Sequence, residues 1–252
     1  MKVGLIGAGR QGWRRAQAIE QVPGTELAVV ADVDSRAGRL LAKGMDCEAT
    51  ANWKDIVERN DLGAVIITTP NHLHAPMCIG AMRRGKHVLC EKPLARNIEE
   101  AKRIIDVARK NRVKLKCGFN LRHHPGMQQA RQWFDKGSIG QLMFLRCRYG
   151  MCGRPGYEKE WRAKRGFSGG GELIDQGVHV LDLFRWFAKD FSQVVGFNPI
   201  YRKELYLIGI FSRDLCHRFL ITSKDDRRPF LTLSSHIISP SKPLRKTAKI
   251  FR

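Results

Sequence analysis

The sequence has no apolar stretch long enough to cross a membrane, and its longest apolar runs have the length of a strand. It opens on a strand-like run where a secretory signal would have a charged and an apolar segment. Its seven cysteines are scattered, without a C-x-x-C pair or a Cys/His spacing typical of zinc. We therefore expect a cytoplasmic protein whose reduced thiols fill its core, with no resident metal.

Acidic residues are scarce relative to basic ones: 24 Asp and Glu stand against 45 Lys and Arg, a formal net charge of +21. Such a charge raises the question of a nucleic-acid partner. The basic residues are dispersed, however, and no zinc finger or stretch of stacked aromatic and basic residues accompanies them. An anionic substrate or a solvated surface explains the charge equally well, so nucleic acid is not an expected partner.

At 252 residues, 43% of them hydrophobic, the chain can form one large or two ordinary domains. Its first residues, MKVGLIGAGRQG, run from an apolar strand into three glycines spaced as G-x-G-x-x-G. In a dinucleotide-binding turn, Gly7 makes the tight turn, Gly9 lets the backbone approach a pyrophosphate, and Gly12 lets the helix pack on its strand. The N-terminus of that helix suits phosphates, so we predict a nucleotide site here.

A second buried strand, residues 27–31, ends at Asp32, 20 residues beyond Gly12. An acidic side chain at this place accepts hydrogen bonds from both adenosine ribose hydroxyls and repels a 2′-phosphate. We therefore predict NAD as the cofactor in preference to NADP. Two alternatives stay open: Arg36 can help a 2′-phosphate if Asp32 turns away, and Asp32 can be an N-cap in a plain β-α-β unit.

Two further strands end in polar residues at the same edge of the predicted sheet. Residues 63–69 form an apolar run that Pro70 breaks, and residues 87–90 form another that leads to Lys92. Ligands of parallel sheets bind at this edge. Lys92 can stabilise a developing alkoxide there, or be a solvated strand-end lysine. We expect the loop TPNHLH to contact the cofactor, although Asn71 can be a helix cap instead. The two histidines of this loop are more often packing residues than metal ligands.

Strands and helices alternate as far as residue 119, which predicts a doubly wound α/β domain. Beyond it, residues 172–187 have apolar side chains at near-helical spacing, which places Asp175 and His179 one turn apart on one face. A carboxylate there can orient the imidazole, and the imidazole can take an alcohol proton. Asp182 can be the orienting partner instead, and such a pair is more often structural than catalytic.

Six segments in a fixed order resemble the glucose-fructose oxidoreductase, inositol dehydrogenase and MocA family (Gfo/Idh/MocA) of nicotinamide-dependent oxidoreductases. They are GLIGAGRQG, ADVD, ITTPNHLH, CEKPLA, GFNLRHHPG and GGGELIDQGVHVLD, and the resemblance covers residues 1 to about 198. It implies a Rossmann domain followed by an α/β substrate domain with a mainly antiparallel sheet. It also implies a polyol or sugar substrate and an association of copies through the outer face of that sheet.

The resemblance carries roles onto individual positions. Lys92, Asp175 and His179 look like the catalytic group: His179 exchanges the hydroxyl proton, Lys92 positions the substrate oxygen and Asp175 the hydrogen-bond network. Asp175 and His179 are also expected to contact the substrate, together with Arg122 and Trp161. The expected cofactor contacts are Gly7, Gly9, Arg10, Gln11, Gly12, Asp32, Thr69, Pro70, Asn71, His74, Glu91, Lys92 and Asn120.

We expect three parts: a Rossmann domain (1–119), a partial substrate domain (120–200) and an atypical basic tail (201–252). The tail holds 12 Lys or Arg and 4 Asp or Glu and shows no sustained strand or helix period. We hypothesise an out-of-frame terminus in place of most of the substrate-domain sheet; the alternative is a divergent short member with a basic extension.

The predicted function is hydride transfer between NAD(H) and a secondary alcohol or ketone of a sugar, cyclitol or sugar derivative. The alternative is an NAD-binding protein without turnover.

Overall fold

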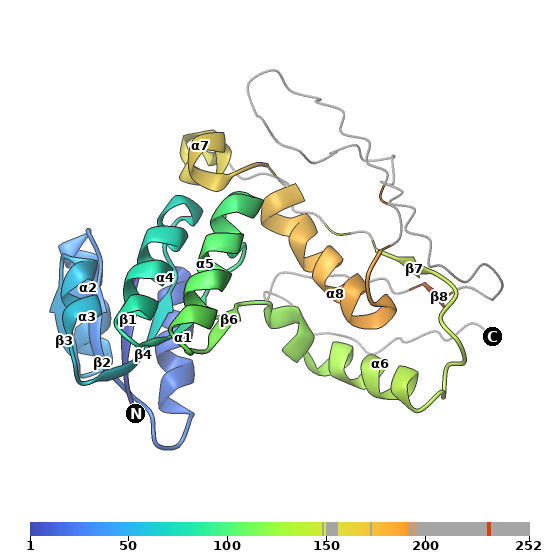
Figure 1. Cartoon of the computed structure of the whole chain (residues 1–252), viewed down its shortest axis with the longest axis horizontal. Coiled ribbons are helices and arrows are strands. Elements are labelled where there is room, and N and C mark those ends of the chain that lie inside the picture. The colour runs from blue at the N-terminus through green and yellow to red at the C-terminus, as the bar shows by residue number, and fades with distance from the viewer. Residues whose placement is uncertain (148, 150–155, 172, 192–193, 195–230, 233–252) are drawn as a thin grey trace.

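The structure, a computed structural model, describes residues 1–147, 149, 156–171, 173–191, 194 and 231–232 (Figure 1). Its strands are β1 (Lys2–Ile6), β2 (Glu26–Ala31), β3 (Glu48–Thr50), β4 (Leu62–Ile67), β5 (His87–Cys90), β6 (Leu115–Cys117), β7 (Leu145–Arg146) and β8 (Leu231–Thr232). Its α-helices are α1 (Arg10–Glu20), α2 (Ser35–Gly44), α3 (Trp53–Glu58), α4 (His74–Arg83), α5 (Ile98–Lys110), α6 (Pro125–Asp135), α7 (Arg165–Ser168) and α8 (Val178–Ala188).

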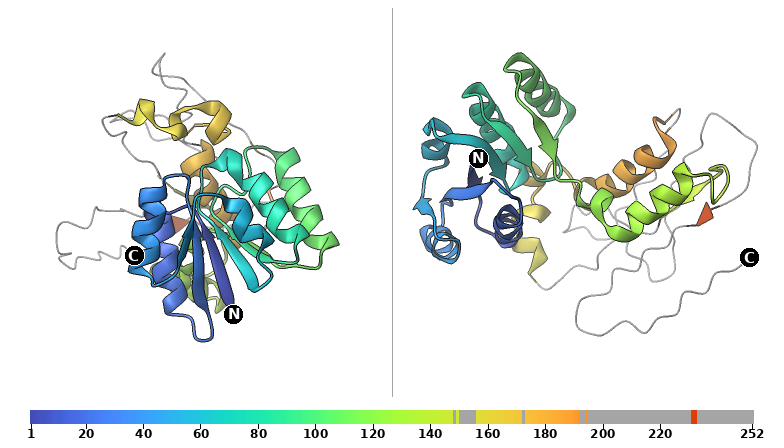
Figure 2. Two further views of the ribbon diagram at one scale, coloured as in Figure 1. Left: turned by 90° about the vertical axis from the view of Figure 1, so that its left-hand side faces the viewer. Right: turned by 90° about the horizontal axis from the view of Figure 1, so that it is seen from below.

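The first six strands form one sheet in the order β3-β2-β1-β4-β5-β6. Every neighbouring pair in it is parallel, so the connections cross over through helices. The two views of Figure 2 show these helices on both faces of the sheet. The predicted doubly wound Rossmann domain is therefore confirmed. The order reverses between β1 and β4, and ligands of such sheets bind at the carboxyl ends of the strands on either side of that point.

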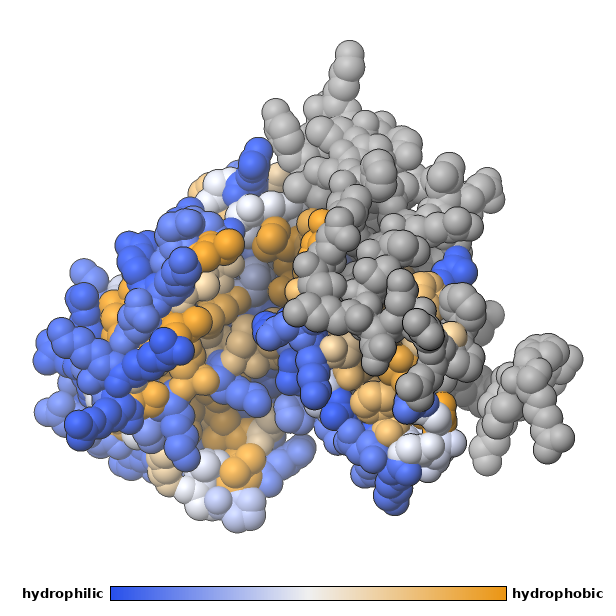
Figure 3. All heavy atoms as spheres, turned by 45° about the vertical axis from the view of Figure 1, so that its right-hand side comes forward, coloured by the Kyte–Doolittle hydropathy of each residue, from blue (hydrophilic) through white to orange (hydrophobic). Residues whose placement is uncertain are grey.

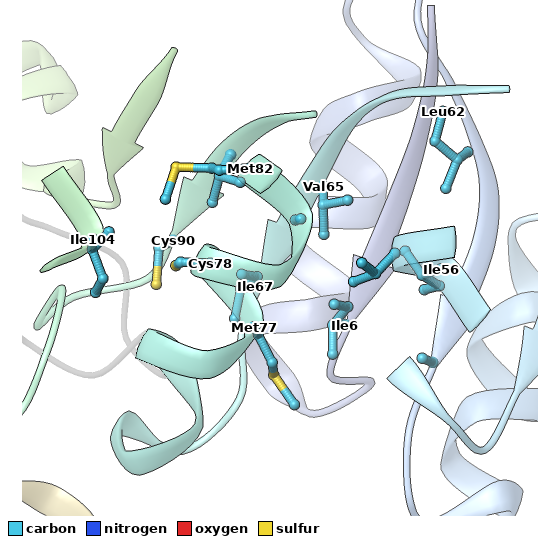
Figure 4. Close-up of a cluster of buried hydrophobic side chains, with 14 of the residues drawn as sticks. Ile6, Ile56, Leu62, Val65, Ile67, Met77, Cys78, Met82, Cys90 and Ile104 are labelled. Carbon is cyan, nitrogen blue, oxygen red and sulfur yellow. The ribbon is translucent and has the colours of Figure 1, made fainter. Parts of the chain in front are cut away.

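Two apolar cores hold the sheet between its helices. On one face, α1 and α2 pack on the sheet through residues such as Leu5, Ala16 and Leu41. On the other, the core contains Ile6, Ile56, Leu62, Val65, Ile67, Met77, Cys78, Met82, Cys90 and Ile104 (Figure 4). Cys78 and Cys90 are fully buried free thiols, as the core-filling interpretation predicts. Apart from Lys2, the central strands β1 and β4 carry no polar side chain, as expected of strands that are covered on both faces.

The described residues after 119 form a second, smaller assembly. Helices α6 and α8 pack together through Phe134, Phe184 and Phe187, and Leu145 of β7 joins this cluster. The strand predicted around residues 142–149 is only two residues long, Leu145–Arg146, and it pairs with β8 in parallel. The rest of the expected antiparallel sheet, and nearly all of the basic tail, lie outside the described residues.

The surface of the described part carries both hydrophilic and apolar residues. On the face seen in Figure 3, hydrophilic residues form the outline of the Rossmann domain, and apolar residues show mainly between them. Within the described ranges, none of the helices is both long and apolar enough to cross a membrane.

Candidate cofactor and catalytic cleft

The glycine-rich turn after β1 has the geometry that its three glycines predict. Gly7 has a φ of +105°, where a side chain is strained, and a Cβ at Gly12 would lie 2.1 Å from the Gly7 carbonyl oxygen. A Cβ at Gly9 would meet nothing within 4 Å. Gly7 and Gly12 are thus needed for the fold, whereas the space in front of Gly9 is open to a ligand.

Helix α1 starts directly from this turn and leaves its N-terminus available to an anion. Gly9 is its N-cap, and within the described Rossmann part no side chain caps it and no acidic residue stands in its first turn. The unpaired N–H groups and the positive end of the helix dipole therefore meet the open space. A pyrophosphate suits this position.

Asp32 lies beside the same space. Its carboxylate accepts hydrogen bonds from the backbone N–H of Ala8 at 2.6 Å and from that of Asp34 at 2.9 Å. These bonds fix the carboxylate beside the glycine-rich turn. Asp34, and not Asp32, caps α2, because its side chain accepts from the N–H groups of Arg36 and Ala37. The N-cap alternative for Asp32 is therefore not what the structure shows.

The loop after β4 is held by His74, which is fully buried. Its two ring nitrogens face the carbonyl oxygens of Pro93, at 2.8 Å, and Thr69, at 2.9 Å. Burial lowers the pKa of His74, and the two carbonyls oppose this shift. His74 thus joins the loops after β4 and β5 to each other. Thr69 and Pro70 of the first loop line the cavity that is described below, whereas His74 does not.

Asn71 of the same loop reaches the second assembly. Its Nδ2 donates to the Ser168 carbonyl oxygen at 2.8 Å, in a buried bond between residues 97 positions apart. Nearby, the rings of His72 and Phe167 are in edge-to-face contact at 4.4 Å. These contacts place residues 157–168 over the carboxyl edge of the parallel sheet.

Lys92, just beyond β5, meets the helical segment that carries Asp175 and His179. Lys92 Nζ donates to Asp175 Oδ1 at 2.9 Å, and each of the two side chains is only 14% exposed. Burial alone would raise the pKa of Asp175, but the Lys92 ammonium outweighs it and holds that pKa below its usual value. The two groups therefore form a buried ion pair.

His179 is buried beside this pair, at 6% exposure. Burial, and then the Lys92 charge, lower its pKa from 6.5 to about 4, against an opposing effect of Asp175. Its ring lies edge-on to Phe119 at 6.3 Å and tilted to Tyr149 at 6.0 Å. Within the part of the chain that the structure describes, its buried Nδ1 has no hydrogen-bond partner. At neutral pH the imidazole is uncharged and can accept a proton.

The expected pairing of His179 with a carboxylate is not found. Residues 173–177 form a π-helical turn before α8, in place of the single α-helix that the spacing predicts. Asp175 is engaged by Lys92, and Asp182 takes two bonds at 2.7 Å from Arg122. Each carboxylate therefore binds a cation, because that interaction is stronger than a bond to a neutral imidazole.

The glycine-rich turn, Asp32 and the Lys92, Asp175 and His179 group line one cavity of about 670 Å³. Most predicted site residues line it: Gly7, Gly9, Arg10, Gln11, Asp32, Thr69, Pro70, Asn71, Glu91, Lys92, Asn120, Trp161, Asp175 and His179. Three predicted residues, Gly12, His74 and Arg122, do not line it. Arg122 is drawn away by Asp182.

The cavity also has lining residues that the sequence reasoning missed, among them Arg14, Tyr149, Tyr157, Arg162 and Gln176. Arg14 lies one turn after Arg10 on α1, so helical periodicity was a signal for it. Gln176 donates to Asp175 at 3.0 Å and follows it in the sequence. Tyr149 comes from a loop, and Tyr157 and Arg162 come from 3-10 helices of three residues, which are too short for a periodic pattern to mark the side that faces a ligand.

Two segments of the chain match models of one protein family. Residues 1–119 match "Oxidoreductase family, NAD-binding Rossmann fold", and residues 127–220 match "GFO/IDH/MocA C-terminal domain". The chain belongs to the Gfo/Idh/MocA oxidoreductase family. The family resemblance of the six segments is thereby confirmed.

Curated members of the Gfo/Idh/MocA family are similar over most of this chain. Levoglucosan dehydrogenase of Pseudarthrobacter phenanthrenivorans is 32% identical over 77% of this chain and 53% of its own length. The rhizopine catabolism protein MocA of Rhizobium meliloti is 34% identical over 73% of this chain and 56% of its own length. This chain thus spans about half the length of the curated relatives it matches.

Solved structures of the Gfo/Idh/MocA family agree in fold. A levoglucosan dehydrogenase structure in complex with NADH and levoglucosan has a TM-score of 0.71 at 30% identity, over 77% of this chain and 55% of that one. A structure named as a myo-inositol dehydrogenase from Sinorhizobium meliloti has a TM-score of 0.66 at 29% identity, over 74% of this chain and 55% of that one.

Proposed function

We propose that this protein transfers a hydride between NAD(H) and a secondary alcohol or ketone of a sugar, cyclitol or sugar derivative. The observation that carries the proposal is that Lys92, Asp175 and His179 line the same cavity as the glycine-rich turn. A dinucleotide seated on the turn would extend toward these three groups. Similarity to a levoglucosan dehydrogenase studied with NADH and levoglucosan supports the substrate class.

The residues present fit a nicotinamide dinucleotide. The open space at Gly9 and the uncapped start of α1 suit its pyrophosphate, and the Asp32 carboxylate suits the ribose hydroxyls of its adenosine. The same carboxylate would repel a 2′-phosphate, which favours NAD over NADP. When bound, the cofactor supplies or accepts the hydride.

The chain's own residues would handle the proton and the oxygen. Lys92 donates hydrogen bonds and carries a positive charge, so it can hold the substrate oxygen and stabilise negative charge on it. Neutral His179 can take the hydroxyl proton as the alcohol is oxidised. Asp175 keeps the Lys92 ammonium in place at 2.9 Å. The low pKa of His179 keeps its imidazole unprotonated over the whole neutral range, which is the form that a base needs.

The test separates cofactor binding from turnover. The purified chain is titrated with NADH and NADPH, and NADH formation is followed with NAD and a panel of sugars and cyclitols. We expect tighter binding of NADH than of NADPH, and turnover of at least one polyol. Lys92→Met and His179→Asn should each lower kcat about 10²-fold or more, and His179→Asn should leave NADH affinity nearly unchanged. Lys110→Met, at an exposed position on α5, is the matched control.

Either of two results would contradict the proposal. Turnover that His179→Asn leaves intact would exclude that residue as the base. Tight NADH binding without turnover across the panel would support the second candidate, an NAD-binding protein that does not catalyse.

A further inference from the structure

A second buried ion pair lies next to the first, and the proposed chemistry does not use it. Arg15 of α1 donates from Nε to Glu91 Oε1 at 2.7 Å, and its Nη2 lies 2.5 Å from the same oxygen. The Glu91 side chain is 8% exposed and that of Arg15 is 24% exposed. Burying a carboxylate this deeply is costly unless it has such a partner.

The end of β6 is shaped around this pair. A Cβ at Gly118 would lie 3.0 Å from Glu91 Oε2 and 3.1 Å from Arg15 Nη2. The Gly118 N–H donates to the carbonyl of Cys90, the residue before Glu91, at 2.8 Å. Glycine at this position leaves room for the two side chains while its backbone holds the end of β5.

Glu91 and Lys92 are consecutive, and both line the cavity. The Lys92 ammonium pairs with Asp175, whereas Arg15 engages Glu91. A Glu91 without Arg15 would be a buried, unpaired charge, and Lys92 is the cation on the neighbouring residue that could neutralise it.

We propose that Arg15 is a positioning residue: by occupying Glu91, it leaves Lys92 to Asp175 and to the substrate oxygen. Arg15 also lies on the helix whose N-terminus forms the glycine-rich turn, so the pair ties the cofactor end of the cleft to its catalytic end. The catalytic significance rests on the proposed function, whereas the placement of Lys92 can be measured without turnover.

His179 provides the readout, because its imidazole senses where the Lys92 charge lies. The charged groups acting on it are Lys92, which lowers its pKa, and Asp175, which raises it; the rings of Phe119 and Tyr149 pack against it. If Lys92 turns to Glu91, the lowering effect weakens. The pKa of His179 is followed by NMR of its ring protons between about pH 3 and 8, a range that includes the midpoint of the unaltered chain. The His179→Asn variant identifies the signal, because it lacks these protons.

Arg15→Met removes the cation and keeps most of the side-chain length. We expect it to raise the pKa of His179 by about one unit or more from about 4, and to lower kcat more than it changes KM for the polyol. Arg15→Lys should restore most of both values. Arg15→Met combined with Glu91→Gln should also restore the pKa, since no competing carboxylate remains. Arg39→Met, at an exposed position on α2, is the control.

An Arg15→Met chain that folds with an unchanged His179 pKa would overturn the proposal, and Arg15 would then be a structural residue. If Arg15→Met does not fold, Gly118→Ala tests the same point without removing a charge. Its methyl group crowds both partners, so a smaller rise in the His179 pKa is expected, and no rise overturns the proposal. If Arg15→Met shifts the His179 pKa but the unaltered chain shows no turnover, the proposed function is refuted and the positioning role of Arg15 is not.

Discussion

The ammonium of Lys92 lies 2.9 Å from the carboxylate of Asp175, although the two residues are 83 positions apart in the sequence. One comes from the end of a Rossmann strand and the other from the π-helical turn before α8. This contact joins the two parts of the chain at the point where the proposed chemistry takes place.

Breaking this ion pair should cost stability. Asp175→Asn leaves the Lys92 charge without its partner, and because each side chain is 14% exposed we expect a loss of about 3 kcal/mol, the lower end of the range for buried pairs. Urea denaturation measures it. Asp190→Asn removes the partner of Arg185 at the surface, where the side chains are 59% and 82% exposed, and should change nothing measurable. Equal effects of the two substitutions would show that Lys92 and Asp175 are not paired in solution.

The three glycines of the turn should respond differently to the same substitution. Gly12→Ala places its Cβ 2.1 Å from the Gly7 carbonyl and should destabilise the fold by about 3 kcal/mol or more. The Cβ added in Gly9→Ala would meet no protein atom within 4 Å. The melting temperature of this variant should therefore stay near that of the unaltered chain. Its methyl group would instead occupy the space meant for the pyrophosphate, and NADH affinity should fall about tenfold or more, equivalent to about 1.4 kcal/mol.

Cofactor choice should depend on Asp32 and not on the carboxylate two residues later. We expect Asp32→Ala to reduce the preference for NADH over NADPH about tenfold or more, a change of about 1.4 kcal/mol. Asp34→Ala removes the N-cap of α2, which should cost about 1 kcal/mol of stability and leave the preference unchanged. Isothermal titration with both cofactors gives the ratio. A preference that survives in Asp32→Ala would point to another determinant.

The folded protein should lose stability as the pH falls from 6.5 to 4. In this window the unfolded chain binds a proton at His179, whose pKa in the folded state is about 4, and the folded chain does not. The free energy of unfolding therefore decreases with falling pH, by up to about 3 kcal/mol for this group. His72 and His74 act in the same direction, because burial lowers the pKa of both.

Urea titrations at several pH values between 4 and 7 measure this dependence. His179→Asn should flatten it, since an amide does not titrate. A dependence that is equally steep in His179→Asn would mean that His179 is protonated in the folded state.

Much of the Rossmann half could be predicted because its signals are local. The glycine spacing and the apolar run of β4 each determine conformation within a few residues. Parallel strands then bring Asp32, Thr69 and Lys92 to one edge by topology alone.

The partners of the charged side chains could not be predicted in this way. Helical spacing suggested that Asp175 would face His179, yet its partner is Lys92, and Asp182 pairs with Arg122. A π-helical turn has no distinct apolar period, so the sequence carried no sign of it.

The six ordered segments identified the family from the sequence. Sequence alone also determined the parallel sheet and the edge at which its polar residues gather, because those features follow from backbone conformation and apolar period. Only the tertiary structure decided which cation meets which carboxylate, where Arg15 and Gly118 stand relative to Glu91, and how far burial lowers the pKa of His179. These depend on distances between residues far apart in the chain and on the exclusion of water, which no local pattern encodes.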